Sequence, residues 1–95
     1  MKFYRDYGQA CFNHIKIRKY QLDAIYMNYL DDKKIYLVRF FKNGKTHNIK
    51  NFAYLYDIYK TFCINGKTYS AEDYGNQDKF TKKSWRRFIK LNTFL

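Results

Sequence analysis

Six cationic side chains recur at helical spacing near the C-terminal end of the chain, and they form its most distinctive chemical group. The group consists of Lys79, Lys82, Lys83, Arg86, Arg87 and Lys90. At 100° per residue these side chains fall within an arc of about 140° on one side of a helix. Their like-charge i,i+4 pairs destabilise a helix by about 0.2–0.5 kcal/mol each. Because an anionic partner would relieve this repulsion, we expect the helix to contact phosphate groups.

Other interpretations of these cations stay open. They could form the solvated outer face of a helix whose other side packs on the domain. They could also dock on an acidic groove of a protein, or rest on an anionic membrane surface. A membrane is a disfavoured partner. No stretch of the sequence approaches the ~18 apolar residues that a membrane span needs.

The helix that carries the cations is expected to run from Asp78 to about Asn92. An apolar side would face the domain, formed by Phe80, Ser84, Trp85, Phe88, Leu91 and Leu95. This spacing is that of one helical face. Asp78 at the N-terminus, with cations towards the C-terminus, suits the helix dipole.

A second group of cations surrounds an expected β-hairpin. Residues 24–30 and 35–41 are rich in aromatic and branched side chains, which favour strands, and residues 31–34 form a polar turn between them. Asn43-Gly44 accepts the positive φ of a type I′ turn, and residues 45–49 would be the returning strand. We expect this hairpin to present four side chains to nucleic acid: Arg39, Lys42, Lys45 and His47.

Two further elements are predicted from periodicity. The alternation from His14 to Arg18 indicates a half-buried strand with a basic outer face. Residues 51–62 carry apolar side chains at helical spacing, which predicts a helix packed across the sheet. Residues 1–13 show no clear period. The predicted fold over residues 1–95 is a single α+β domain, with a small antiparallel sheet of three to four strands packed on a helix and a basic amphipathic C-terminal helix.

Residues 22–62 carry a resemblance to known DNA-binding domains. Tyr36-Leu-Val-Arg-Phe-Phe-Lys-Asn-Gly-Lys45, followed by Phe52 and the expected helix, resembles the AP2/ERF domain and the related arm-binding domain of tyrosine integrases. The resemblance implies a three-stranded antiparallel sheet that lies in the major groove of DNA and is braced by one helix. The residues nearest DNA would then be Arg39, Lys42, Lys45 and His47. The sequence departs from the pattern at Lys50, where a glycine is usual, and at Ile58 and Tyr59, where the helix usually has small residues.

Composition supports a polyanionic partner. The 19 Lys and Arg outnumber the eight Asp and Glu, which gives a net charge of +11, and aromatic residues make up 22% of the chain. Such a charge attracts phosphate backbones, and bases stack on aromatic rings. The two cysteines, Cys11 and Cys63, are too few for a disulfide-rich secreted scaffold. We therefore expect a cytoplasmic protein with reduced thiols.

Patterns typical of catalysis or metal binding are weak. Cys11 and His14 have ligand-like spacing, but His47 and Cys63 are isolated from any second close pair. The acidic residues 31–32, 72–73 and 78 are better explained as solvated turn residues than as a metal-dependent nuclease site. His47 is the only candidate acid or base for a small ribonuclease. We expect no cofactor, no bound metal and no enzymatic activity.

Two functions from different classes follow from these patterns. The first is noncatalytic binding of DNA or RNA, with Lys and Arg contacting phosphates. The alternative is a small inhibitor from a phage or plasmid that binds a host nucleic-acid enzyme, as anti-CRISPR and anti-restriction proteins do. Phe, Tyr, Ile, Asn and Lys, which have A/T-rich codons, make up 50 of the 95 residues, and this bias is common in mobile elements. The sequence predicts neither the oligomeric state nor a preference for DNA or RNA, or for single or double strands.

Overall fold

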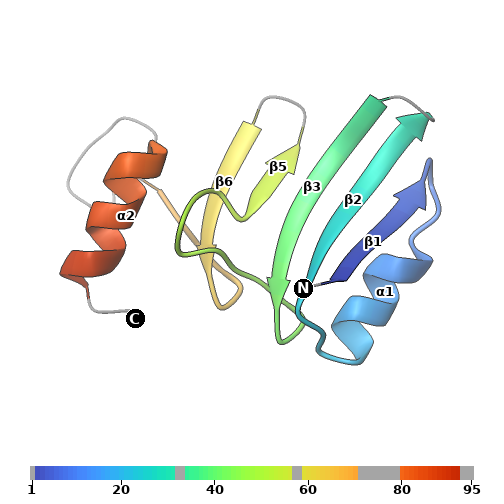
Figure 1. The fold of residues 1–95 in the computed structure, drawn as a ribbon, viewed down its shortest axis with the longest axis horizontal. Coiled ribbons are helices and arrows are strands. Elements are labelled where there is room, and N and C mark those ends of the chain that lie inside the picture. The colour runs from blue at the N-terminus through green and yellow to red at the C-terminus, as the bar shows by residue number, and fades with distance from the viewer. Residues whose placement is uncertain (1, 32–33, 57–58, 71–79, 93–95) are drawn as a thin grey trace.

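The computed structural model describes residues 2–31, 34–56, 59–70 and 80–92. These residues form β1 (Lys2–Tyr7), α1 (Phe12–Lys19), β2 (Ala24–Asp31), β3 (Lys34–Lys42), β4 (Lys45–Thr46), β5 (Tyr54–Tyr56), β6 (Tyr59–Ile64), β7 (Lys67–Tyr69) and α2 (Lys82–Leu91). The sheet has the order β1-β2-β3-β5-β6-β7, and β4 pairs with β3 (Figure 1). The α+β class is confirmed, whereas the seven strands of the described residues exceed the three or four expected.

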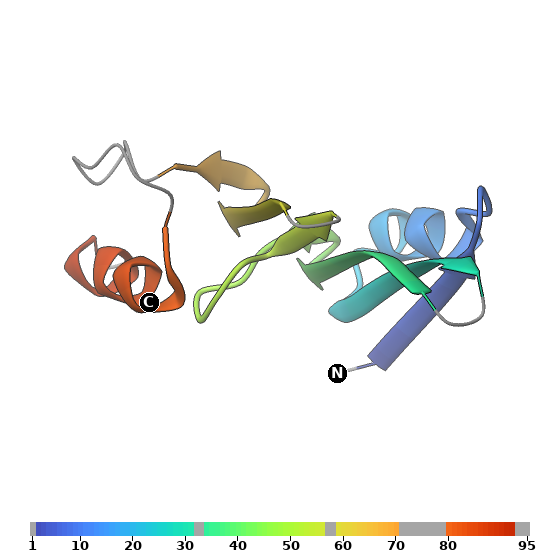
Figure 2. The ribbon, with the colours of Figure 1, turned by 90° about the horizontal axis from the view of Figure 1, so that it is seen from above.

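The two helices cover opposite faces at opposite ends of the sheet (Figure 2). Helix α1 places Ile17 on one face, in a cluster with Ala24, Tyr26 and Phe41 of β2 and β3. Helix α2 packs on the other face, where it buries Trp85, Phe88 and Ile89 against Phe62 and Ile64 of β6. Among the described elements, no helix covers β1–β3 on the α2 side or β5–β7 on the α1 side. Of the described helices, therefore, only one covers each face of the sheet, and it does so at one end.

The predicted hairpins are confirmed, with a shorter returning strand. Strands β2 and β3 are antiparallel neighbours, and Asn43-Gly44 turns the chain at φ values of 52° and 74°. A side chain at Gly44 would bring a Cβ within 2.9 Å of the Gln21 Cα, so this turn requires glycine. The expected strand over residues 45–49 ends at Thr46, because Asn48 N–H donates to the Cys63 carbonyl at 3.1 Å and the chain leaves β3.

The predicted strand from His14 to Arg18 is wrong, because these residues belong to α1. The N-cap residue Cys11 makes no side-chain capping hydrogen bond. Instead, the Asp6 carboxylate of β1 accepts hydrogen bonds from the backbone N–H groups of Asn13 and His14, at 3.2 and 3.3 Å. A residue outside the helix thus satisfies its free N–H groups, as a capping side chain would. In the helix only one of the two alternating isoleucines is buried. Ile17 packs in the core, whereas Ile15 is exposed.

The predicted helix over residues 51–62 is also wrong. Its residues contribute to β5 and β6, an antiparallel pair in which Tyr54 faces Thr61 and Leu55 faces Lys60. Tyr, Thr and Phe favour the pleated sheet, and their alternation with a period of two outweighs the helical spacing of the apolar residues. The helix expected to brace the sheet at this point, which the AP2/ERF resemblance also implies, is therefore replaced by two strands.

Strand β1 was not expected from the sequence. It pairs in parallel with β2, with Lys2 opposite Ala24 and Tyr7 opposite Tyr29. Parallel strands need a crossover connection, and here α1 forms it. The misassignment of residues 14–18 and the missing strand thus have one origin, because β1 and α1 form a single β-α-β unit with β2.

The C-terminal helix is confirmed with a later start. Thr81 is its N-cap, and its hydroxyl accepts a hydrogen bond from Ser84 N–H at 3.1 Å. Phe80 precedes the helix and is buried in the same cluster. The Trp85 Nε1–H donates to the Asn48 carbonyl at 2.9 Å, which ties the helix to the chain between β4 and β5. Asp78 and Lys79 lie outside the described residues.

Candidate nucleic-acid interface

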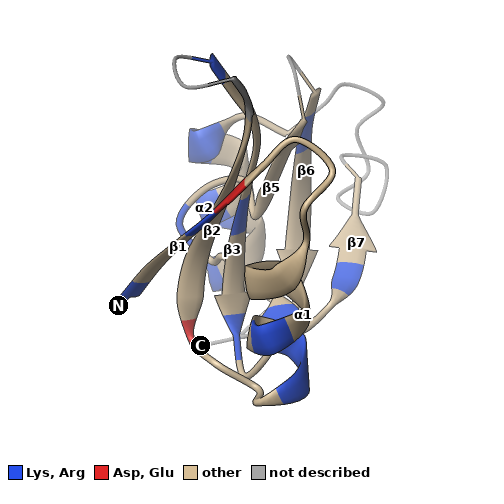
Figure 3. Cartoon of the chain, turned by 90° about the vertical axis from the view of Figure 1, so that its right-hand side faces the viewer, with Lys and Arg blue, Asp and Glu red and all other residues tan. Residues whose placement is uncertain are grey.

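Five of the six predicted helical cations lie together on the outer surface of α2: Lys82, Lys83, Arg86, Arg87 and Lys90. All five side chains are exposed, and the helix contains no acidic residue. None of them forms an ion pair with another described residue. Trp85, Phe88 and Ile89 pack the other side of the helix against the domain, so these cations lie on the side that faces away from the core. Figure 3 shows how strongly Lys and Arg outnumber Asp and Glu along the described chain.

The four hairpin residues do not share one surface. Lys42 and Lys45 are paired across β3 and β4 and are exposed. Arg39 lies three positions before Lys42 on the same strand, so its side chain points to the opposite, α1-covered face. His47 is half-buried, and its Nδ1 accepts a hydrogen bond from Asn65 N–H at 3.0 Å. Burial, followed by the positive charge of Lys42, lowers the pKa of His47.

An aromatic surface covers the open half of the sheet on the α2 side. Phe3 and Tyr7 of β1 are 59% and 52% exposed, and Arg5 lies between them on the same face. The Tyr7 ring stacks on the Tyr29 ring of β2, with centroids 5.3 Å apart and planes inclined by 27°. We call Phe3, Tyr7 and Tyr29 the aromatic platform. Residues 1–13 show no clear period, so the sequence did not place the rings of Phe3 and Tyr7.

The aromatic platform and α2 lie on the same side of the sheet. Side chains directly opposite each other in paired strands share a face. The pairs Phe3–Ile25, Ile25–Phe40, Val38–Leu55 and Leu55–Lys60 follow this face from β1 to β6. Phe62 and Ile64, which contact α2, continue the same alternation in β6. The exposed cations and the exposed rings can therefore contact one ligand that runs along this side.

Arg39 and His14 form a contact on the α1 side. The Arg39 Nη1 lies 3.2 Å from the His14 Nε2. Because arginine only donates, Nε2 must accept, and this requires a neutral imidazole. Burial lowers the pKa of His14, and the charges of Arg39 and Arg18 lower it further, whereas Asp6 opposes them.

The His14 contact predicts a dependence of stability on pH. Since folding lowers the pKa of His14 below 6.5, the unfolded chain binds a proton more readily in the window below that value. The contribution of neutral His14 to the free energy of unfolding is complete above pH 6.5 and is lost as the pH falls through the lowered pKa. Urea unfolding at pH 7.5, 6.5 and 5.5 should show a smaller loss of stability in His14→Gln than in the wild type. His47 is present in both proteins, so its contribution cancels, and equal losses would contradict the contact.

The metal-ligand candidates of the sequence are not gathered into a site. Cys11 is exposed and Cys63 is buried, and both thiols are free. Cys11 and His14 border the same small hollow, but no group of three or more Cys, His, Asp or Glu side chains forms among the described residues. The described helices, of eight and ten residues, are too short and too polar to cross a membrane.

Comparison of the chain with protein-family models, with curated proteins and with solved structures gives no match.

Proposed function

We propose that the protein binds nucleic acid without catalysing a reaction. One observation carries the proposal: helix α2 presents five exposed cations, none of them paired with a described acidic residue, on the side of the sheet that also holds the aromatic platform. Exposed cations bind the phosphates of a nucleic acid, and exposed aromatic rings stack on its unstacked bases.

The contacts divide between the two parts of this surface. Lys and Arg of α2 would bind phosphate oxygens, which supplies affinity without sequence preference. Phe3 and Tyr7 would stack on bases, and Arg5 between them would contact the backbone. A ring can stack on a base only when that base is unpaired. We therefore propose that single-stranded DNA or RNA is the preferred ligand.

A salt series tests this function. Purified protein is titrated with labelled single- and double-stranded DNA and RNA between 50 and 200 mM salt. Each phosphate contact lowers the slope of log K against log salt by about 0.7 on a single strand, so the five cations predict a slope near −3.5. Single-stranded ligands should bind more tightly than duplexes at every salt concentration. Weak binding to all four ligands would exclude the proposal.

The alternative is an inhibitor that docks on a host nucleic-acid enzyme. The open sheet face favours it, because Phe3, Tyr7 and Ile35 (47% exposed) would also suit a protein interface. An interface anchored by aromatic side chains responds far less to salt than phosphate binding does. A protein partner captured with a flat salt dependence, together with weak nucleic-acid binding, would favour this alternative.

A further inference from the structure

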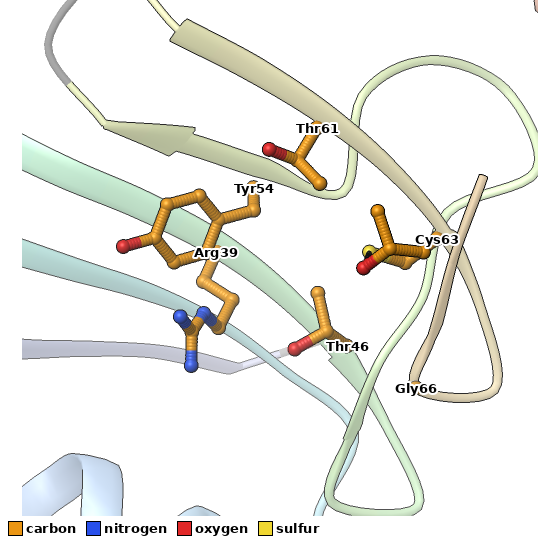
Figure 4. Close-up of a pocket in the computed structure, with 7 residues that line it drawn as sticks. Arg39, Thr46, Tyr54, Thr61, Cys63 and Gly66 are labelled. Atoms are coloured by element: carbon orange, nitrogen blue, oxygen red, sulfur yellow. Dashed lines mark hydrogen bonds between the residues drawn. The ribbon is translucent and has the colours of Figure 1, made fainter. Parts of the chain in front are cut away.

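A small hollow lies on the α1 side of the sheet, in the half that α1 leaves open over β5–β7 (Figure 4). It has a volume of about 260 Å³. Seven residues line it: Arg39, Thr46, Tyr54, Thr61, Cys63, Gly66 and Thr68. The Thr68 hydroxyl lies 3.7 Å from the Cys63 Sγ. The hollow is on the face opposite to the aromatic platform, so it is separate from the proposed nucleic-acid surface.

The Arg39 side chain is held in one position. Its Cζ lies 4.1 Å from the centroid of the Tyr54 ring, so the guanidinium stacks on that ring, and Nη1 contacts His14 Nε2 at 3.2 Å. Its Nε is buried and has no hydrogen-bond partner among the described residues. A buried donor without a partner destabilises the folded state, and more so when the group is charged.

The positive charge of Arg39 is not neutralised by the described residues. The lining of the hollow contains no carboxylate. Asp6, the buried acid on the same face, accepts hydrogen bonds from Tyr26 Oη at 2.7 Å and from the backbone N–H groups of Asn13 and His14. Its carboxylate thus serves α1 and the buried tyrosine. A half-buried cation that borders a hollow lined by three threonines and no carboxylate favours an anion as ligand.

We propose that this hollow binds the phosphate group of a small phosphorylated ligand. A guanidinium matches two phosphate oxygens at once, and threonine hydroxyls can donate to the others. A volume of about 260 Å³ is below the range of roughly 300–1,000 Å³ typical for drug-sized ligands, so one phosphate and little more would enter. The phosphate could belong to a free nucleotide or to the 5′ end of a nucleic-acid strand.

The test uses inorganic phosphate as the probe, added to ¹⁵N-labelled protein at constant ionic strength set with chloride. Saturable NMR shifts should appear at Thr46, Thr61 and Thr68. Arg39→Gln should weaken binding by about tenfold or more, since a hydrogen bond to a charged group contributes about 1.5–3 kcal/mol. Arg39→Lys keeps the charge but loses the paired geometry, so it should bind at an intermediate level. Because Arg39→Gln could disturb the fold, Thr61→Val provides a second, nearly isosteric variant with the same expected direction.

Absence of saturable shifts, or equal binding by wild type, Arg39→Gln and Thr61→Val, would overturn the proposal. Competition identifies the source of the phosphate. AMP should displace the inorganic phosphate if free nucleotides bind. If strand ends bind, an oligonucleotide with a 5′ phosphate should displace the inorganic phosphate at a lower concentration than the same oligonucleotide with a 5′ hydroxyl. Failure of both competitors would also overturn it. Arg86→Glu/Arg87→Glu should leave phosphate binding unchanged, so this site and the α2 surface can fail independently.

Discussion

Reversing the charge of Arg86 and Arg87 together is expected to lower nucleic-acid affinity on the order of 100-fold or more, with the fold intact. Both side chains are exposed and unpaired with described residues. Hydrogen bonds to charged groups contribute about 1.5–3 kcal/mol each, and 1.4 kcal/mol corresponds to tenfold in affinity. The Arg86→Glu/Arg87→Glu variant loses two such contacts and also repels the backbone. Fluorescence anisotropy at 100 mM salt measures the loss.

Thermal unfolding of the same variant should be unchanged or slightly improved. The like-charge i,i+4 pairs of Arg86 with Lys82 and Lys90, and of Arg87 with Lys83, become opposite-charge pairs. A stability gain with a binding loss would show that α2 retains its cations for a ligand rather than for folding.

A matched control separates local contacts from net charge. The Lys16→Glu/Lys19→Glu variant changes the total charge by the same amount. Both lysine side chains are exposed on α1, which lies on the other side of the sheet. If both double variants lose the same affinity, the protein acts only as a diffuse cation. If Arg86→Glu/Arg87→Glu binds like the wild type, the cations of α2 are only a solvated outer face.

The parts of the fold that local residues determine could be predicted from sequence. Helix α2 combines an apolar side with a cationic side, and both sides are present in ten consecutive residues. The hairpin turns follow from Asn-Gly pairs, which adopt the expected positive φ values. The five described cations of α2 were therefore found in advance as one surface.

The remaining parts depend on residues far apart in the chain. Helix α1 begins where the Asp6 carboxylate accepts its N–H groups, and no local pattern reveals that contact. Residues 54–56 and 59–64 form strands because the edge of β3 pairs with β5, and β5 in turn pairs with β6. The spacing of Arg39 and Lys42 on one strand already places their side chains on opposite faces. Which of those faces α1 covers depends on the pairing of β1, β2 and β3, and the sequence does not show it. The aromatic platform was missed for the same reason, since it requires β1 beside β2.

Replacing the aromatic platform is expected to reduce binding of single strands selectively. Stacking of a base on an aromatic ring contributes about 1–3 kcal/mol, so Phe3→Ala/Tyr7→Ala should weaken single-stranded binding by at least tenfold. Duplex binding through α2 should change far less, because paired bases cannot reach the rings. Both side chains are more than half exposed, so the variant should fold. Binding of single-stranded and duplex oligonucleotides of equal length measures the difference.

The chain supplies its own control for exposed rings. Phe12 and Tyr20, at the two ends of α1, are 80% and 61% exposed and belong to the opposite side of the sheet. Phe12→Ala/Tyr20→Ala removes a similar amount of aromatic surface and should leave single-stranded binding unchanged. A different result is expected if the platform is a protein surface: Phe3→Ala/Tyr7→Ala would keep its affinity for single strands but lose self-association or a protein partner in sedimentation. If only Phe3→Ala/Tyr7→Ala weakens single-strand binding, the side of the sheet on which a ring lies decides binding, and its exposure alone does not.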